Sequence, residues 1–511
     1  MTDKTDNGPT NRVVRAGHGV LVRARNGDVI GYDPTGLVLR LSDKVIDDIA
    51  LRLGGRLGGR LQAEGSAPAA GSDPRDVADL EAMLEGRDVW NIRAEGDWLR
   101  FSGRLPGRQG PRDFRLSRAG GDVVADAPGA VVGILGIGGP RAALANPEGA
   151  AYPFHILAPA DDIGAVGHAG VERAAVTDLL AQLREMTHEA LMAEVCLDWQ
   201  LDKHAGLPLF VTRVETDSSA SAAALAEGVA VDNLLRAAAN LKLAAARLGK
   251  PARIFAVTLD FALEAVEGSA TDYRDGMLAL MDRIEAGLAK LGFDRPVFLA
   301  RFEAGRPGLT PDRVIEAQWE LAWNCGAHRL VISAPSTMFA HDDYDRPTPE
   351  ARRQMAAMSA AAASAAGAQS LKPEPLMDGW RCPVIHLAEL EAGPKGSVVL
   401  RLILRALGDL VLAPGDSVGG DRPVGFALDG DRAGAKILSV AVDPGDAQAV
   451  LITLDKRPDG DAFLRYGYGV APDGPGQVAI RDGWELTAAD GRVLHRWALP
   501  CRLAIREGGA A

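Results

Sequence analysis

The stretch VDNLLRAAANLKLAAARLGKPARIFAVTL, residues 231–259, predicts one amphipathic helix followed by one buried strand. Its apolar residues recur at intervals of three and four positions, which is the spacing of one helix face. Gly249 and Pro251 predict the end of the helix, and the short apolar run after them is typical of a buried strand. Further apolar runs are separated by helical patterns, at residues 153–158, 208–213, 297–302 and 330–333. This alternation predicts βαβ crossovers around a parallel sheet, so we expect an α/β fold.

The pattern changes along the chain and predicts four parts. Residues 1–65 combine a hairpin signal with a helical pattern, which predicts a small β-hairpin/helix attachment unit. Residues 75–150 carry short alternating stretches interrupted by Gly and Pro, which indicates a small β-rich unit. The α/β pattern covers residues 151–372. Beyond it the apolar residues recur at every second position, so residues 373–511 are expected to form a C-terminal β-sandwich.

Composition and charge exclude several classes of protein. Hydrophobic residues make up 47% and charged residues 24% of the 511 residues, which excludes a disordered chain. The formal net charge is −12, and this argues against nucleic-acid binding because that affinity depends on basic groups. We expect no membrane span, because the sequence has no apolar run of the length that crossing a membrane requires. The polar N-terminus has no apolar signal segment, so we expect synthesis in the cytoplasm without a signal peptide.

Metal and cofactor sites are not expected from this sequence. The four cysteines lie far apart without a Cys-x-x-Cys pair, which argues against both a zinc site and a disulfide framework. Buried reduced thiols are the simpler interpretation. The glycines of residues 136–139 do not form a phosphate-binding loop, because no Lys-Ser or Lys-Thr pair follows them. We therefore expect neither a metal ion nor a cofactor.

Several segments, taken in chain order, carry a family resemblance. They are Gly268-Ser-Ala-Thr-Asp-Tyr273, Ala317-Gln318, Ser333-Ala-Pro335, Asp343-Tyr-Asp-Arg-Pro-Thr348, Arg481-Asp482-Gly-Trp484 and Arg496-Trp497-Ala-Leu-Pro500. With this order the chain resembles the SGNH (GDSL-like) hydrolases, in particular the sialate O-acetylesterase-like branch found in phage and gene-transfer-agent spike and fibre proteins. The resemblance implies a flavodoxin-like core with a parallel sheet, followed by a β-sandwich.

The same resemblance implies where the catalytic groups would stand, and those positions are degenerate here. The family's serine nucleophile follows the first strand; if residues 153–158 are that strand, Asp161 holds its place. Ser219 and Ala262 stand in the blocks that supply oxyanion-hole donors. Asp343 keeps the place of the family's aspartate, but Arg346 replaces the histidine. Because an arginine cannot act as a general base at neutral pH, we expect an inactive esterase site.

Two other interpretations stay open from the sequence. Ser218 or Ser219 could be a relocated nucleophile with His341 as base and Asp343 or Asp345 as its orienting acid. The chain would then be an active carbohydrate O-acetylesterase with an unconventional triad. The simpler interpretation is that these serines are turn or cap residues and His341 is a solvated loop residue. The second open interpretation is a purely architectural protein with a vestigial pocket.

The favoured hypothesis is a structural protein of a phage-like particle, such as a head spike or tail fibre, that binds cell-surface or capsular polysaccharide. Its expected ligand-binding residues are Asp161, Asp260, Asp343 and Arg346, because ligands of parallel sheets bind beyond the carboxyl ends of the strands. We expect the N-terminal units to bind other structural proteins of the particle. We also expect a homo-oligomer that lies on the surface of the released particle.

Overall fold

The computed structural model describes two compact units, Met1–Pro74 and Arg75–Ala511. In the first unit, β1 (Gly19–Arg23), β2 (Val29–Asp33) and β3 (Gly36–Arg40) form an antiparallel sheet. The helix expected after this sheet lies outside the described residues. The described residues of the second unit are 75–161, 163–303, 312–344, 346–369, 379–393, 397–413, 425–467 and 480–508.

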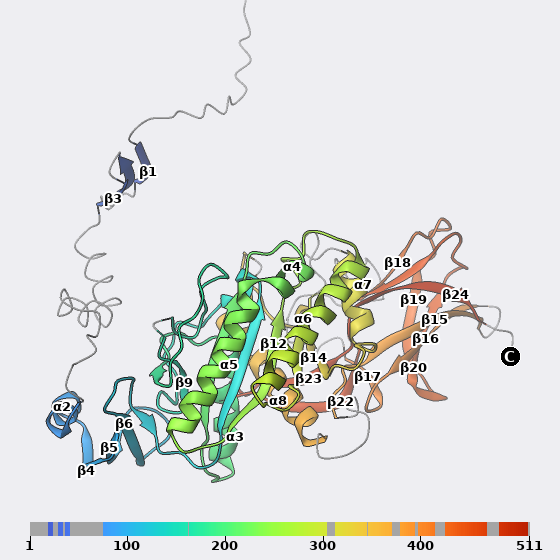
Figure 1. Ribbon diagram of the computed structural model, residues 1–511. Coiled ribbons are helices and arrows are strands. Elements are labelled where there is room, and N and C mark those ends of the chain that lie inside the picture. Colours follow the sequence, from blue (N-terminus) through green and yellow to red (C-terminus); the bar gives the residue numbers. More distant parts are fainter. Residues whose placement is uncertain are drawn as a thin grey trace, which may run out of the picture. The chain divides into compact units, whose positions relative to one another are not determined.

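The second unit contains a seven-stranded sheet, seen edge-on among the helices in Figure 1. In spatial order its strands are β10 (Leu180–Gln182), β9 (Ile156–Pro159), β11 (Leu209–Thr216), β8 (Val131–Gly138), β12 (Ala252–Asp260), β13 (Phe298–Phe302) and β14 (Leu330–Pro335). The edge strand β10 is antiparallel to β9, and the other pairs are parallel. The predicted α/β architecture with a parallel sheet is therefore confirmed.

β8 is the strand that the sequence pattern did not predict. It lies within residues 75–150, the range expected to form a small β-rich unit, yet it pairs with β11 on one side and β12 on the other. Its sequence, VVGILGIG, contains three glycines, and glycine weakens the signal of a strand. The first strand of the parallel sheet is therefore β8, and the strand expected in that role, β9, lies next to the edge.

Helices cover both faces of this sheet. Ile134 packs in one core, with α3 (His188–Asp202) and α8 (Pro349–Gln369), and the neighbouring Leu135 packs in the other. That second core includes α4 (Ala222–Glu227), α5 (Val229–Arg247), α6 (Ala270–Lys290) and α7 (Asp312–Leu321). Successive side chains of β8 thus point to opposite faces, as they do in a strand buried on both sides. Figure 1 shows α5 and α6 side by side on one face.

Local signals explain where several of these helices begin and end. The side chains of Ser221 and Ser269 accept hydrogen bonds from the backbone at the starts of α4 and α6. Asp272 returns a hydrogen bond to the backbone of Ser269, which completes a capping box. After α5, Gly249 has a φ of +69°, the left-handed conformation that glycine adopts at helix C-termini. The predicted end of this helix is therefore confirmed.

A small antiparallel sheet and one short helix precede the parallel sheet. The elements are α2 (Val77–Met83), β4 (Asp88–Glu95), β5 (Trp98–Arg104), β6 (Arg112–Ser117) and β7 (Val124–Ala125). Leu80 of α2 and Phe101 of β5 belong to a core that also includes Leu241 and Leu248 at the end of α5. Burial of these apolar side chains holds the small sheet against the helical layer.

The C-terminal region is rich in β-strands, as predicted. One sheet has the order β18 (Phe426–Asp429), β21 (Phe463–Tyr466), β24 (Cys501–Glu507), β15 (Val384–Ala392), β16 (Val398–Arg405), β20 (Asp446–Leu454) and β19 (Ile437–Asp443). A second sheet has the order β17 (Leu410–Leu412), β22 (Ile480–Thr487) and β23 (Val493–Trp497). Arg496 and Asp482 form a buried ion pair of 2.6 Å, and the Arg496 guanidinium lies 5.6 Å from the centre of the Trp484 ring. These residues of the C-terminal motifs therefore stabilise the fold.

Three further side-chain and helix features agree with the sequence. The indole nitrogen of Trp319 donates a hydrogen bond of 2.9 Å to the carbonyl of Ile385, so this tryptophan joins α7 to the C-terminal strands. All four cysteines lie among the described residues as free thiols, and three of them are buried. Within the described part of the chain, no helix is long and apolar enough to cross a membrane.

Candidate functional site

The carboxyl ends of β8, β12 and β13 meet at one edge of the sheet, which is where ligands bind in folds of this kind. β8 leads into a short 3₁₀ helix, η1 (Pro140–Ala143). A cavity of about 30 Å³ lies there. Its charged and histidine side chains are Arg141, Asp260, Glu264, Arg301, Glu303 and His341. A cavity of this size has room for water molecules but not for a sugar ring.

The observed strand order changes which residue stands at the position expected for the nucleophile. The sequence interpretation placed it at Asp161, after residues 153–158, but those residues end in β9 rather than in the first parallel strand. In a doubly wound sheet of the flavodoxin type the first strand lies inside the sheet, between the second and third. β8 occupies this position between β11 and β12. β8 ends at Gly138 and is followed by Gly139, so in the strand order that the resemblance implies the nucleophile would stand here and not at Asp161.

Neither of these two glycines leaves room for a side chain. A Cβ atom on Gly139 would lie 2.5 Å from the Cδ of Glu264 and 2.9 Å from its Cβ. On Gly138 it would overlap the carbonyl oxygen of Asp260. Gly139 has a φ of −79°, which any residue adopts, so its backbone conformation does not require glycine. The side chain of Glu264 is what excludes a larger residue from this position.

Arg301 connects the carboxylates at the edge of the sheet. Its guanidinium pairs with Asp260 and lies 3.6 Å from the carboxylate of Glu303. Burial by itself would lower the pKa of Arg301, but the charges of Asp260 and Glu303 raise it above its ordinary value. The backbone N–H of Glu303 donates a hydrogen bond of 3.0 Å to the side chain of Gln318. Gln318, from one of the segments of the resemblance, thus helps to position this network.

Glu264 differs from the ion-paired carboxylates around it. Burial and, to a smaller extent, the negative charge of Asp260 raise its pKa to about 7, although hydrogen bonding from the backbone of Arg141 opposes the shift. The distance from that backbone nitrogen to the Glu264 oxygen is 3.2 Å. A carboxyl group with this pKa exchanges a proton near neutral pH. Glu264 therefore has the properties of a general acid or base, although the cavity beside it is too small for a sugar substrate.

His341 lines this cavity and is partly exposed on its loop. Its Nδ1 is 2.7 Å from the carbonyl oxygen of Phe339, so in the neutral ring Nδ1 carries the proton and donates it to that oxygen. The other nitrogen, Nε2, is then the basic one. The cavity that His341 lines has neither Ser218 nor Ser219 among its lining residues. The structure therefore brings His341 close to the end of β8 and not to either serine.

The two serines have local roles. The hydroxyl of Ser219 donates a hydrogen bond of 2.7 Å to the carboxylate of Asp217, whose other contact is the backbone N–H of Ser219. These bonds form a turn directly after β11. Ser218, beside it, is exposed. This arrangement agrees with the simpler interpretation of these serines as turn residues.

Asp161 belongs to a buried ion network away from the cavity. One terminal nitrogen of Arg213 donates to both Asp161 oxygens at 2.5 Å, and the other lies 3.5 Å from the carboxylate of Glu215. The side chain of Asp161 is fully buried, and those of Arg213 and Glu215 are 1% exposed. Burial raises the pKa of Glu215 to about 7, although the charge of Arg213 opposes the shift. The carboxylate of Asp161, expected to bind ligand, therefore neutralises an internal arginine instead.

Of the remaining predicted residues, Asp260 alone lines the cavity. Arg346 is about half exposed and pairs with Asp342 at 3.0 Å, so it does not stand where a base would act. Asp343 is exposed, and Ala262 is buried in the apolar core. Sequence reasoning missed Arg141, Glu264, Arg301 and Glu303 because no spacing along the chain connects them. The described residues contain no cluster of His, Cys, Asp and Glu side chains suited to a metal ion.

A second polar layer lies beneath the cavity. Glu189 is buried and accepts a hydrogen bond from the hydroxyl of Thr258. Burial raises the pKa of Glu189, and it lowers the pKa of His188 on the same helix. His188 in turn lies 3.1 Å from the hydroxyl of Ser359 on α8. Polar groups buried in this way rigidify the layer between the sheet and α3.

The sequence matches no protein-family model and no curated protein. Its fold is similar to a solved structure described as a novel carbohydrate acetylesterase from Xanthomonas citri. The TM-score is 0.45 at 14% sequence identity, and the alignment covers 79% of this chain and 84% of the other. The function of the present chain is therefore inferred from its own residues.

Proposed function

We propose that this chain is a non-catalytic relative of the SGNH hydrolases that binds carbohydrate as a structural component of a phage-like particle. The observation that carries the non-catalytic part is at the end of β8. The first parallel strand ends at Gly138 and is followed by Gly139, and Glu264 fills the space that a nucleophilic side chain on Gly139 would need. Without a nucleophile there, His341 has no hydroxyl to deprotonate.

The carbohydrate and particle parts of the proposal rest on the resemblance of the sequence to spike and fibre proteins. In this proposal the flavodoxin-like core and the C-terminal β-rich region form the recognition part. The units before Val131 attach the chain to other particle proteins, and several copies assemble as a homo-oligomer. The cell-surface or capsular polysaccharide binds outside the 30 Å³ cavity, because that cavity cannot hold a sugar ring.

The first experiment pairs an ester-hydrolysis assay with a glycan-binding screen on the same purified chain. We expect no turnover of p-nitrophenyl acetate or acetylated xylan above the buffer rate, no labelling by a fluorophosphonate serine probe, and retained glycan binding. Turnover that is lost in Ser219→Ala or His341→Ala would overturn the non-catalytic assignment. Absence of binding to every glycan would overturn the carbohydrate assignment.

A second experiment tests the strand register. The double variant Gly139→Ser with Glu264→Ala places a hydroxyl at the end of β8 beside His341 and removes the side chain that excludes it. We expect the fluorophosphonate probe to label the double variant and neither single variant. Labelling of wild type and the double variant to the same extent would show that a serine elsewhere reacts, and would contradict this placement of the site.

The particle assignment has its own measurement. We expect the chain to sediment with released particles after nuclease treatment and to be lost from them when residues 1–65 are deleted. A chain found entirely in the particle-free fraction would contradict the structural role while leaving the glycan-binding result intact.

A further inference from the structure

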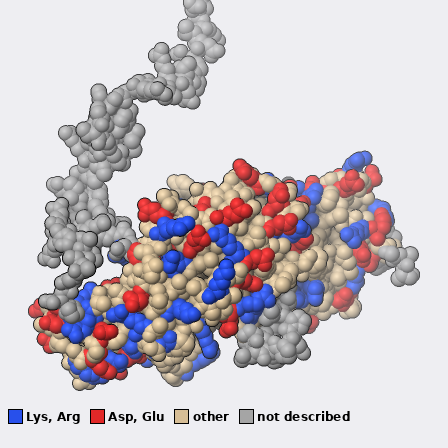
Figure 2. Space-filling view, in the orientation of Figure 1, with Lys and Arg blue, Asp and Glu red and all other residues tan. Residues whose placement is uncertain are grey.

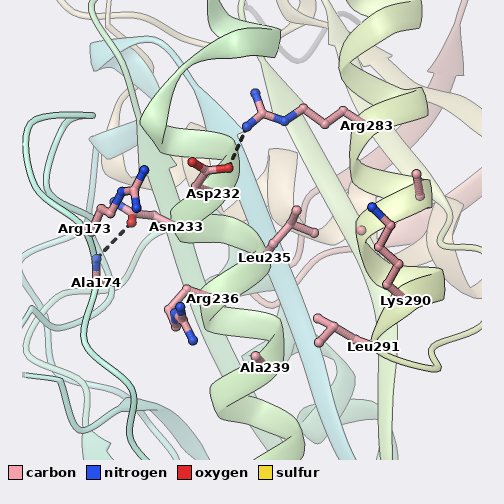
Figure 3. A pocket seen from close by; sticks show the side chains of 12 residues that line it. Arg173, Ala174, Asp232, Asn233, Leu235, Arg236, Ala239, Arg283, Lys290 and Leu291 are labelled. Carbon is pink, nitrogen blue, oxygen red and sulfur yellow. Dashed lines mark hydrogen bonds and ion pairs between the residues drawn. The ribbon is translucent and has the colours of Figure 1, made fainter.

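A groove of about 550 Å³ lies between α5 and α6, on one of the two helix-covered faces of the sheet. It shares no lining residue with the cavity at the carboxyl edge of the sheet. Figure 3 shows that its lining comes from α5, from α6 and from the loop that carries Arg173 and Ala174. The floor is apolar and includes Leu235 of α5 and Leu291 after α6. A volume in this range is typical of sites for small ligands, which occupy roughly 300–1,000 Å³.

Positive charge dominates the groove. Four cationic side chains line it, namely Arg173, Arg236, Arg283 and Lys290, against the single carboxylate of Asp232. Arg283 pairs with Asp232 at 2.6 Å, whereas the other three cations have no ion pair with any residue that the structure describes. In the orientation of Figure 1, Figure 2 shows Lys and Arg side chains over α5 and α6, interspersed with Asp and Glu side chains.

This concentration of charge runs against the composition of the chain. Acidic residues outnumber basic ones by 68 to 56 over the whole sequence. Cations that are held together without counter-charges repel one another, and a concave surface with one sign of charge attracts ligands of the opposite sign. The groove therefore favours a negatively charged ligand.

Buried asparagines hold the loop of Arg173 in place. The side chain of Asn233, 1% exposed, accepts a hydrogen bond of 2.9 Å from the backbone of Ala174 and donates one of 2.7 Å to the carbonyl of Glu172. Two turns further along α5, Asn240 makes the same pair of bonds to the backbone of residues 175 and 177. These hydrogen bonds attach the backbone of residues 172–177 to α5, so Arg173 is held beside Arg236.

The other wall of the groove is also built closely. A Cβ atom on Gly287 of α6 would overlap the methyl groups of Leu235, so glycine at this position lets α6 approach α5. Arg283, one turn earlier, donates both to Asp232 and to the carbonyl of Ala226. Its guanidinium is therefore fixed, whereas those of Arg173 and Arg236 are free to bind a ligand.

We infer that this groove binds an acidic oligosaccharide that carries carboxylates, such as a hexuronate. Its cations would pair with the carboxylates, and its apolar floor would contact the sugar carbons. Among its lining residues there is no aromatic ring, and single-stranded nucleic acids are bound largely by stacking on such rings. The preference for an anion rests on the groove alone, while the choice of carbohydrate rests on the proposed function.

Calorimetric titration of the full chain tests this inference with four probes. They are galacturonic acid oligosaccharides, neutral maltooligosaccharides of equal length, inorganic phosphate and oligothymidylate. We expect the acidic oligosaccharide to bind most tightly and to weaken as salt is added. Arg173→Ala, Arg236→Ala and Lys290→Ala should each reduce its affinity by about 10-fold or more, through the loss of a charge-assisted hydrogen bond.

Two further variants distinguish binding in the groove from nonspecific electrostatic attraction to the protein surface. Ala286→Trp keeps every cation but fills the groove from α6, and we expect it to abolish binding. Lys203→Ala removes one exposed cation at the end of α3, in the helical layer on the opposite face of the sheet, and should leave the affinity unchanged. Arg236→Ala, on an exposed position, keeps the test valid if Ala286→Trp does not fold.

The outcomes distinguish this inference from the proposed function. Acidic oligosaccharide binding that is unchanged in all groove variants would overturn the groove while supporting carbohydrate binding. Phosphate binding that the groove variants abolish, with no saccharide bound, would support the anion site and overturn its assignment to carbohydrate. Tighter binding of oligothymidylate than of the saccharide would replace the ligand class. No binding of any anion would overturn the inference.

Discussion

Replacing Glu215 by glutamine should make the stability of this protein less sensitive to pH. The Glu215 side chain is 1% exposed next to Arg213, and burial raises its pKa to about 7. In the unfolded chain the carboxyl returns to its ordinary value of about 4.3. Between these two values the folded state binds more protons than the unfolded state, so the free energy of unfolding falls as the pH rises. Over this window the loss is about 3 kcal/mol, at about 1.4 kcal/mol per unit of pKa difference.

The free energy of unfolding of wild type and of Glu215→Gln is measured by urea titration at several pH values from 4.5 to 8, with tryptophan fluorescence as the signal. We expect the difference, variant minus wild type, to increase by about 3 kcal/mol from the lowest to the highest pH. Glu264 also titrates near pH 7, but it is present in both proteins and cancels in the difference. Glu227→Gln, an exposed carboxylate on α4, is the matched control. A difference that is constant with pH, or that decreases, would refute the burial of Glu215 as the cause.

Three other substitutions test separate parts of the structure. Gly139→Ser should lower the free energy of unfolding by about 1–3 kcal/mol through its clash with Glu264. Adding Glu264→Ala to the same chain should restore most of this loss. If urea unfolding shows that the two substitutions have independent, additive effects, the contact between these residues is contradicted. Asp482→Ala should lower the free energy of unfolding by about 3–5 kcal/mol because it leaves the Arg496 guanidinium buried without its partner. A melting temperature equal to that of wild type would show that the pair is not buried. Ser269→Ala removes the cap of α6 and should cost about 0.5–2 kcal/mol, whereas Ser269→Asp should retain the stability, which thermal unfolding measures.

The non-catalytic assignment joins two facts about one small region. Glu264 excludes a side chain from Gly139, and the space that remains beside His341 holds only water. The charged side chains there neutralise one another through Arg301 rather than facing an open pocket. The groove between α5 and α6 has a larger volume, and three of its cations have no ion pair with any described residue.

The parts of the fold that were predicted correctly depend on short-range signals. The helical spacing that ends at Gly249 and the apolar runs of β11 and β12 are all readable within a few residues. Each is determined by local backbone preferences and by which faces must be buried. For the same reason the α/β class and the β-rich C-terminal region followed from the sequence.

β8 shows where such signals fail. Its glycines indicate a loop, but in the sheet they are required by neighbours that are distant in sequence. A Cβ atom on Gly133 would lie 2.7 Å from a methyl carbon of Leu241, and one on Gly136 would lie 2.5 Å from the hydroxyl of Thr258. Glycine in a central strand thus reflects close packing from both faces. Because β8 was missed, the first strand of the parallel sheet was expected at β9, two positions away in the sheet.

By itself, the sequence determined the α/β class of the fold, the β-rich C-terminal region and the end of α5 at Gly249. Only the tertiary structure decided that β8 is the first strand, that Asp161 neutralises Arg213, and that the Glu264 side chain excludes a residue larger than glycine at position 139. The physical reason is the range of the interactions. Helix caps and apolar spacing act within a few residues, whereas steric exclusion and the pairing of buried charges act between groups that folding alone brings together.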